Sequence, residues 1–238
     1  MSPTPSDHPT RLPSYRIETP RLIIRSGVPS DAPAQAALLS APENHPFTPP
    51  DSGAVEEHLG RLERWASKRA EGNFAFMVVT LRDGTLVGFA GFNEFRWGDP
   101  LDPASYDATT AVASEGEDTG GQEEGGGENG APRVAGLKFL EADIGVLLDY
   151  RYWRKGYGRE VVAAEVEYAF DVLGADHIDC DTQMENEPWR ALVRSMGLGA
   201  SESMRVAGRF GDDWVYRFGR PLWEEAKAGM KANGSWPL

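Results

Sequence analysis

Cysteine is almost absent from this chain of 238 residues, and Cys180 is its single representative. One cysteine cannot form an intramolecular disulfide, which excludes a disulfide-stabilised scaffold and predicts a reducing, cytoplasmic location. The four histidines, His8, His45, His58 and His177, are scattered along the sequence. Because a metal site needs several ligands at matched spacings, we expect no metal in this protein.

Long apolar runs and an excess of basic residues are lacking as well. No stretch approaches the roughly 20 apolar residues that a transmembrane helix requires, so we expect no membrane span. Lysine and arginine number 24 against 37 aspartates and glutamates, which gives a formal net charge of −13. This balance argues against nucleic acid or an anionic membrane surface as a partner, and it favours partners that are basic or carry an amine.

The composition divides the chain into a domain and three accessory segments. Residues 1–14 are rich in proline and lack an apolar signal core, so we expect a disordered lead-in. Residues 98–133 consist mainly of Gly, Glu, Asp and Ser and cannot bury enough apolar surface to offset the entropy of ordering. We expect a disordered acidic insertion there, which is either a docking segment or, the favoured alternative, a tolerated surface loop. Residues 220–238 are expected to form a helical extension.

Between these segments, residues 15–219 show the alternation of a mixed α/β domain. Residues 15–27 predict one strand, Ser30 is the expected N-cap of a first helix, and residues 52–72 predict a second helix. The run 74–95 predicts two strands joined at Asp83-Gly84, a dipeptide that tolerates the positive φ of a tight hairpin. After the insertion we expect, in order, a strand, a helix over 158–173, a strand, a helix stopped by glycine, and two strands that turn at Gly211 to Asp213.

Two glycines stand two residues apart in "WRKGYG", residues 153–158, between the apolar run "IGVLL" and the expected helix. The first N–H groups of a helix are free, and the helix dipole adds about half a positive charge. Glycine lets a phosphate approach the backbone, and Arg151, Arg154, Lys155 and Arg159 add positive charge. This pattern predicts a site for a diphosphate-bearing cofactor, although the glycines alone would equally suit a plain strand-to-helix turn.

The stretch resembles the acyl-CoA-binding motif A of the GNAT N-acetyltransferase superfamily, usually written Q/R-x-x-G-x-G/A. Trp153 takes the Q/R place, a departure typical of the ribosomal-protein N-acetyltransferase (RimJ/RimL-like) branch. Further segments are similar to that branch in the same order: "ETPRLIIR", "LVGFAGF", "ADIGVLLDYRYWRKGYG" and "N.PW..LVRSMGL". The resemblance covers residues 15–219 apart from the insertion. It implies an α/β GNAT fold, a mixed twisted sheet with splayed central strands flanked by helices on both faces.

The same resemblance implies acetyl-CoA as co-substrate and a primary amine as acceptor, either a small molecule or a peptide N-terminus. It implies direct acetyl transfer in a ternary complex, by a monomer or a homodimer. The expected contacts with the cofactor's phosphates are Arg154, Lys155, Gly156, Tyr157, Gly158 and Arg159. The backbone of Val146, Leu147 and Leu148 would bind the pantetheine arm like an added strand. Asn186 matches an asparagine that contacts the cofactor, and it would also serve well as a helix N-cap.

Amide formation requires a neutral amine, and therefore a base or a water chain that reaches it. In this branch a carboxylate on or beside the fourth strand often fills that role, and Asp143 matches its position. Glu141, two residues earlier, lies on the same face of a regular strand. A structural role for Asp143 is an equal alternative, and Glu94 is a third candidate.

The proton for the departing thiolate has no obvious donor. The family's serine lies three residues after the asparagine, and Trp189 stands at that place. Tyr150, Tyr152 and Tyr216 are candidate substitutes, although packing is the commoner role for each. This departure keeps two alternatives open: a catalytically weak acyl-CoA sensor, and an interaction protein that works through the acidic insertion. We expect Cys180 to be a buried side chain rather than a nucleophile.

Overall fold

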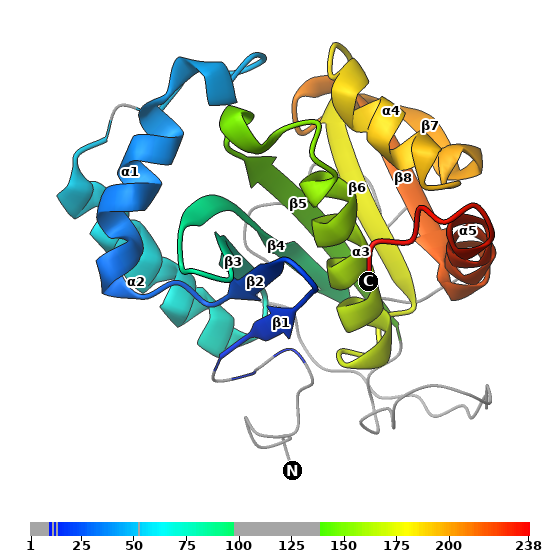
Figure 1. Ribbon diagram of the computed structural model, residues 1–238, viewed down its shortest axis with the longest axis horizontal. Coiled ribbons are helices and arrows are strands. Elements are labelled where there is room, and N and C mark those ends of the chain that lie inside the picture. The colour runs from blue at the N-terminus through cyan, green and yellow to red at the C-terminus, as the bar shows by residue number, and fades with distance from the viewer. Residues whose placement is uncertain (1–9, 11, 13, 52, 98–138) are drawn as a thin grey trace, which may run out of the picture.

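The computed structural model describes residues 10, 12, 14–51, 53–97 and 139–238, so the expected acidic insertion and most of the lead-in lie outside the described residues. Eight strands form one sheet in the order β1-β2-β3-β4-β5-β6-β8-β7. Figure 1 shows α3 in front of the centre of this sheet, α1 and α2 beside its N-terminal strands, and α5 beside β8.

The N-terminal part of the sheet consists of β1 (Arg16–Glu18), β2 (Leu22–Arg25), β3 (Ala75–Leu81) and β4 (Leu86–Trp97), with α1 (Ala32–Ser40) and α2 (Val55–Glu71) between β2 and β3. The predicted hairpin at Asp83-Gly84 is confirmed, and Gly84 has a φ of 91°. The prediction of one strand over 15–27 is wrong. Thr19 donates its N–H to the Leu22 carbonyl at 3.0 Å, and this tight turn folds the segment into two antiparallel strands.

The first helix also begins differently from the prediction. Ser30 lies inside a short 3₁₀ turn, Pro29–Asp31, and Asp31 precedes α1 as its N-cap. The Asp31 carboxylate accepts hydrogen bonds from Arg25 at 2.8 and 2.9 Å and from the Val28 N–H at 2.8 Å. The Asp31 carboxylate therefore fixes the turn before α1, and Ser30 is not the N-cap.

The C-terminal part contains β5 (Leu140–Leu148), α3 (Tyr157–Asp171), β6 (His177–Gln183), α4 (Glu187–Ser195), β7 (Glu202–Gly208), β8 (Gly211–Gly219) and α5 (Arg220–Ala232). The predicted turn at Gly211 to Asp213 is two residues too late, because β7 and β8 are joined by Arg209 and Phe210. Ala207 and Gly211 have φ values of 55° and 102°, so the change of direction lies around these two connecting residues.

The sheet opens between β5 and β6. These strands are parallel and pair over only three positions, Glu141–Asp143 opposite His177–Asp179, whereas the other neighbouring strands are antiparallel. Beyond Asp143, β5 stays paired with β4 as far as Leu148, while β6 stays paired with β8 as far as Gln183. The two strands diverge in Figure 1, as expected for splayed central strands.

The two faces of the sheet differ in character. On one face α3 and α5 pack against apolar side chains; Tyr168 lies 6.5 Å from Phe92, and Trp223 lies 6.3 Å from Phe218, between ring centroids. On the other face α2 covers β3 and β4, with Trp65 against their aromatic side chains. Helices therefore flank both faces, and the part of the second face formed by β5, β6 and β8 carries charged residues instead.

Candidate active site

The loop between β5 and α3 has two residues in the left-handed region. Arg154 has a φ of 57° and Gly156 a φ of 81°. A short 3₁₀ turn, Tyr150–Tyr152, precedes them, and α3 begins at Tyr157, one residue before the predicted start. The chain therefore turns sharply before α3, and the first N–H groups of the helix lie at the end of β5.

Contacts from distant parts of the chain hold this loop. Arg21 donates from Nη1 to the Lys155 carbonyl at 2.8 Å and from Nε to Glu160 Oε2 at 2.5 Å. Glu160 is fully buried, and the Thr19 hydroxyl donates to its Oε1 at 2.6 Å. The turn between β1 and β2 thus fixes the position of the glycine loop.

The Trp153 side chain gives this loop a second anchor. Its Nε1 donates to the Leu148 carbonyl at 2.7 Å. Leu148 is one of the three residues expected to bind pantetheine through the backbone, and its carbonyl is already engaged by the loop. Val146 and Leu147 lie on the part of β5 that has no pairing with β6. The backbone groups of Val146 and Leu147 on the open edge of β5 are therefore better candidates for binding pantetheine than the Leu148 carbonyl.

The residues of the glycine loop fit a phosphate-bearing group. A Cβ built on Gly158 would lie 3.2 Å from Leu192 Cδ2, and one on Gly156 would lie 3.3 Å from Arg21 Nη2, so larger side chains would crowd the loop. Arg154 and Lys155 are exposed. Arg159 differs, because its Nη2 donates to Ser195 Oγ of α4 at 2.9 Å. The loop thus combines free helix N–H groups, two glycines and two exposed cations.

Asn186 is the N-cap of α4. Its Oδ1 accepts a hydrogen bond from the Trp189 N–H at 3.2 Å, and its Nδ2 donates to Thr182 Oγ1 at 2.8 Å. Both ends of the amide are therefore used within the chain. Tyr216, one candidate acid, is buried and donates its hydroxyl to Glu202 at 2.5 Å. Burial and the Glu202 carboxylate raise the pKa of Tyr216, so its proton is held firmly.

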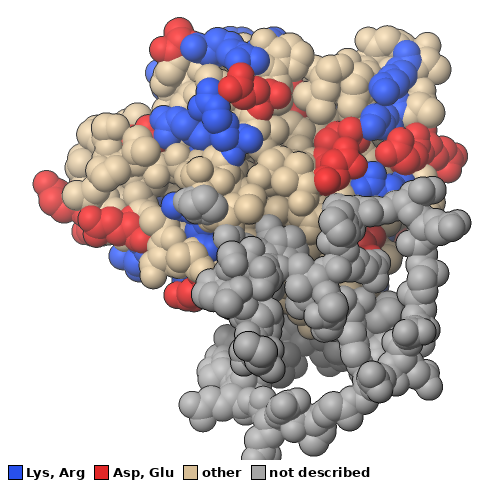
Figure 2. Space-filling view, turned by 90° about the horizontal axis from the view of Figure 1, so that it is seen from below, with Lys and Arg blue, Asp and Glu red and all other residues tan. Residues whose placement is uncertain are grey.

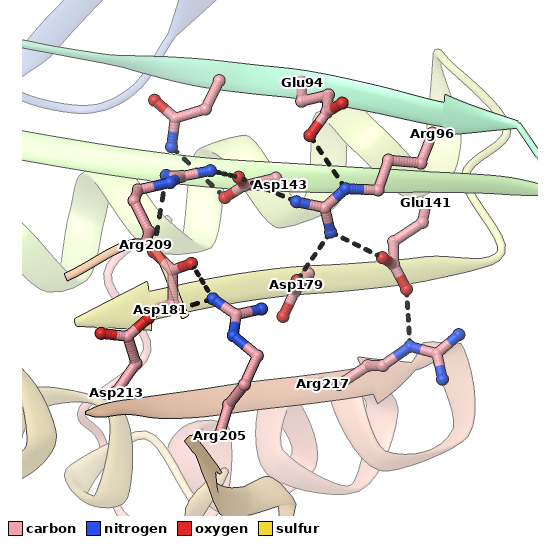
Figure 3. A network of polar contacts seen from close by, with 11 residues as sticks. Glu94, Arg96, Glu141, Asp143, Asp179, Asp181, Arg205, Arg209, Asp213 and Arg217 are labelled. Carbon is pink, nitrogen blue, oxygen red and sulfur yellow. Dashed lines mark hydrogen bonds and ion pairs between the residues drawn. The ribbon is translucent and has the colours of Figure 1, made fainter. Parts of the chain in front are cut away.

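The predicted catalytic carboxylates lie together on the charged face of the sheet (Figure 3). Arg96 bridges them, with Nη1 3.0 Å from Glu141 Oε1 and Nη2 3.5 Å from Asp143 Oδ2. Asn93 donates to Asp143 Oδ1 at 3.3 Å, and Arg209 pairs with Asp143 Oδ2. Glu94 is on the same side but exposed, and it accepts from Arg96 at 2.9 Å. Both Asp143 and Glu141 are buried.

Sequence reasoning missed the other members of this network. Asp179 accepts from Arg96 at 2.9 Å, Arg217 donates to Glu141 at 2.5 Å, and Arg205 pairs with both Asp181 and Asp213. The alternation in "HIDCDT" could have revealed Asp179 and Asp181, because residues two apart on a strand share a face. The arginines come from β4, from β7, from the turn after it and from β8, and no local pattern links them.

Burial makes two of these carboxylates, Asp143 and Asp179, more basic than in water. It raises the pKa of Asp143, an effect that the neighbouring Arg209 and Arg96 oppose and the Asp181 carboxylate strengthens. Burial, together with Asp143 and Glu141, raises the pKa of Asp179 to about 7. A carboxylate with a raised pKa is a better proton acceptor near neutral pH. The network therefore holds groups that could exchange a proton with an amine.

Two other kinds of site are absent from the described residues, and one hollow lies apart from the predicted site. Among residues 10, 12, 14–51, 53–97 and 139–238, no cluster of His, Cys, Asp and Glu side chains could hold a metal ion, and no helix is long and apolar enough to cross a membrane. A shallow hollow of about 420 Å³ between β1 and α3 is lined by residues such as Thr19 and Tyr168, and none of the predicted site residues lines it. Figure 2 shows basic and acidic side chains interspersed on the face seen from below.

The sheet order, the parting of β5 and β6 and the glycine loop before α3 together define an acetyltransferase fold. Residues 21–199 match the model of the acetyltransferase (GNAT) domain family, and the chain belongs to the GNAT acetyltransferases.

Individual relatives support the fold at greater distance. The uncharacterised N-acetyltransferase YoaA of Bacillus subtilis is 29% identical over 84 residues, which is 35% of this chain and 44% of that protein, so the match spans less than half of its length. Mycobacterium smegmatis RimJ in complex with CoA-disulfide superposes with a TM-score of 0.61 at 17% identity, over 93% of this chain and 94% of that one. RimL, a ribosomal L7/L12 α-N-protein acetyltransferase in complex with coenzyme A, gives 0.56 at 13% identity, over 86% and 98%.

Proposed function

We propose that this protein is an N-acetyltransferase that transfers the acetyl group of acetyl-CoA directly to a primary amine in a ternary complex. One observation carries the proposal: β5 parts from β6 directly after the buried Asp143, and the open edge of β5 then runs to the glycine loop. A ligand that lies along this edge would have its phosphates at the helix start and its other end beside a carboxylate.

The chain's own residues divide the binding of acetyl-CoA among them. The N–H groups of Tyr157 and Gly158 would face the phosphates, with Gly156 permitting the close approach and Arg154 and Lys155 supplying charge. Val146 and Leu147 would bind the pantetheine arm through the backbone, next to Leu148. Arg159 and Asn186 would contact the cofactor near the start of α4. Their positions there are held by the hydrogen bonds from Arg159 to Ser195 and from Asn186 to Thr182. Acetyl-CoA itself supplies an acetyl thioester, which is activated toward amines.

Asp143 is the base in this proposal. It would accept a proton from the ammonium form of the acceptor, directly or through water, and leave a neutral amine whose lone pair forms the new C–N bond as the C–S bond breaks. The thiolate takes up a proton, so that one proton is released overall. Glu141 would hold Arg96 in place, because it is bonded to both Arg96 and Arg217. Glu141 lies two residues further back, where β5 is still paired with β6, and this favours Asp143, at the last paired position, over Glu141.

The acceptor would be a peptide N-terminus, a protein or a small amine. RimL, whose fold is similar, acts on the α-amine of a ribosomal protein according to its description, and this supports a protein or peptide acceptor. The buried carboxylates beside the open edge of β5 support a cationic one. We place the protein in the cytoplasm on the strength of its single cysteine, and we take it to act as a monomer or a homodimer.

Two measurements test this function. Acetyl-CoA and CoA should raise the melting temperature by mass action, whereas NAD and ATP should not. Thiol release should follow when acetyl-CoA is mixed with a panel of tripeptides with a free α-amine, Nα-blocked lysine and spermidine. Equal stabilisation by all four nucleotides would reject the acetyl-CoA site. Stabilisation by acetyl-CoA without thiol release from any amine would favour the alternative, a catalytically weak acyl-CoA sensor.

A further inference from the structure

Arg209 crosses from β5 to β6 where these strands part (Figure 3). Its Nη2 pairs with Asp143 Oδ2 at the end of the paired stretch of β5. Its Nη1 lies 3.4 Å from Asp181 Oδ1, and Asp181 is two residues beyond the last position at which β6 pairs with β5. One guanidinium therefore spans the opening that separates the proposed base from the neighbouring strand.

The two carboxylates and the arginine differ sharply in accessibility. The side chains of Asp143 and Asp181 are 1% and 4% exposed, while that of Arg209 is 37% exposed. Arg209 also lies in the two-residue connection between β7 and β8, beside the exposed Phe210. The carboxylates belong to the interior of the site, and Arg209, the cation that contacts both of them, reaches in from the surface beside Arg96 and Arg205.

A neighbouring atom shows that this site has acceptor capacity to spare. Asp179 is 3% exposed, and its Oδ2 accepts from Arg96, but its Oδ1 has no hydrogen-bond partner among the described residues. Asp179 pairs in register with Asp143 across the last linked position of β5 and β6. A buried oxygen of this kind is costly unless a donor satisfies it. The two terminal nitrogens of Arg209 contact Asp143 and Asp181 and leave this oxygen without a donor. An ammonium group has three N–H donors, enough for all three carboxylates.

We propose that the ammonium group of the acceptor binds between Asp143 and Asp181 by displacing Arg209, with Asp179 as a further hydrogen-bond acceptor. This inference rests on the proposed function and deepens it, because it assigns the acceptor subsite and the charge that the acceptor must carry. Arg96 and Arg205 would stay beside Asp143 and Asp181, and a cation in the place of Arg209 would keep the charge of the buried carboxylates balanced as before, which a neutral ligand cannot do. The released guanidinium moves into water, where its hydration is favourable.

Arg209 is then a residue that sets acceptor specificity. It competes with every acceptor, so the apparent affinity for an amine is reduced by the fraction of time in which Arg209 lies in the site. Acceptors without a positive charge cannot displace it and are excluded. The displacement also delivers the ammonium directly to Asp143, the group that has to take its proton.

The test measures binding apart from catalysis. The dissociation constant of Ala-Ala-Ala amide is measured by calorimetry with the full chain saturated with CoA, so that no transfer can occur. If Arg209 lies in the site about nine-tenths of the time, R209Q binds this tripeptide about ten-fold more tightly than wild type. N-acetylated Ala-Ala-Ala amide, which lacks the charge, should show no such gain. Equal or weaker binding of the free tripeptide by R209Q, or no binding by either protein, overturns the inference.

Two further variants complete the design. R220Q is the matched control, because Arg220 is 35% exposed and pairs with an exposed carboxylate, Asp171, outside the site; it should bind like wild type. R209K keeps the charge but cannot span both carboxylates, so it should bind a few-fold more tightly than wild type. Should R209Q fail to fold, unchanged binding by R209K overturns the inference. Tripeptide binding that behaves as expected, with no acetylated product from any amine, would reject only the transferase function.

Discussion

The two ends of the open edge of β5 are built in different ways. At the glycine loop the shape of the site is defined mainly by the backbone, through left-handed residues, free helix N–H groups and a carbonyl bonded to Trp153. At Asp143 the site is defined by side chains, because Arg96 and Arg209 reach the carboxylate from another strand and a turn. The first end should therefore respond to changes in backbone freedom, and the second to changes in charge.

The largest expected effect is at the side-chain end. Asp143→Asn keeps the size of the side chain but removes the proposed base, so turnover should fall by roughly 10²- to 10⁴-fold while acetyl-CoA affinity stays within a few-fold. The defect should shrink at high pH, where more of the acceptor amine is already neutral. Steady-state kinetics across pH check this. Asp171→Asn makes the same change at an exposed residue outside the site and should be silent. Wild-type turnover in the Asp143 variant would remove it from the mechanism.

A smaller effect is expected at the backbone end. Gly156→Val places a β-branched residue at a φ of 81°, where a strain of about 1–3 kcal/mol is typical. The loop should relax away from its shape, and acetyl-CoA affinity should fall roughly 10- to 100-fold in a calorimetric titration. Gly84→Val introduces similar strain at a φ of 91° in the hairpin between β3 and β4. If both variants lose acetyl-CoA affinity equally, the effect is a general loss of stability and the loop has no special role.

The link between β1–β2 and the loop provides a third, weaker test. Arg21→Ala removes one partner of the buried Glu160, which should cost about 1–3 kcal/mol of unfolding free energy and weaken acetyl-CoA binding a few-fold. Urea denaturation measures the first effect and titration the second. Arg16→Ala breaks an ion pair whose side chains are 53% and 47% exposed, so it should change neither by a significant amount. A loss of stability without any change in acetyl-CoA affinity would show that the contacts of Arg21 do not position the glycine loop.

The smallest expected effect is a pH dependence at Asp179. Its pKa is raised to about 7 in the folded chain, so its contribution to stability is fully present below the pKa of the unfolded state and is lost as pH rises through 7. Raising the pH from 6 to 8 should therefore cost the wild type about 1 kcal/mol relative to Asp179→Asn, whose side chain does not titrate. Urea unfolding of both proteins at several pH values measures the difference. Parallel curves would mean that Asp179 remains ionised throughout.

The sequence predicts the backbone end better than the side-chain end for a physical reason. Gly156 and Gly158 lie within one short segment, and the hairpin at Asp83-Gly84 is encoded by two neighbouring residues. Steric requirements that involve neighbouring residues can be recognised in a short stretch of sequence. The two strands in residues 15–27 were missed because one backbone hydrogen bond, from Thr19 to Leu22, interrupts an otherwise regular alternation.

The charged network around Asp143 can hardly be recognised in the sequence. Asp143 and Glu141 could be proposed from the resemblance, but their partners come from residues 45 to 76 positions away in the chain. The turn between β7 and β8 was placed two residues too late, and with it the position of Arg209 was lost. Only the tertiary fold brings Arg209 to Asp143, so its role could not be predicted from spacing.

The alternation in β6 has a consequence for how the sheet assembles. Ile178 and Cys180 are buried apolar residues of the core, while Asp179 and Asp181 pair with arginines on the opposite face. A slip of β6 by one residue against β8 would press two carboxylates onto the apolar core and place two apolar side chains among cations. Each unpaired buried charge costs several kcal/mol, so the misaligned strand would be strongly disfavoured while the sheet forms. The residues proposed to receive the amine thus also allow only one alignment of β6, the strand that joins the two parts of the sheet.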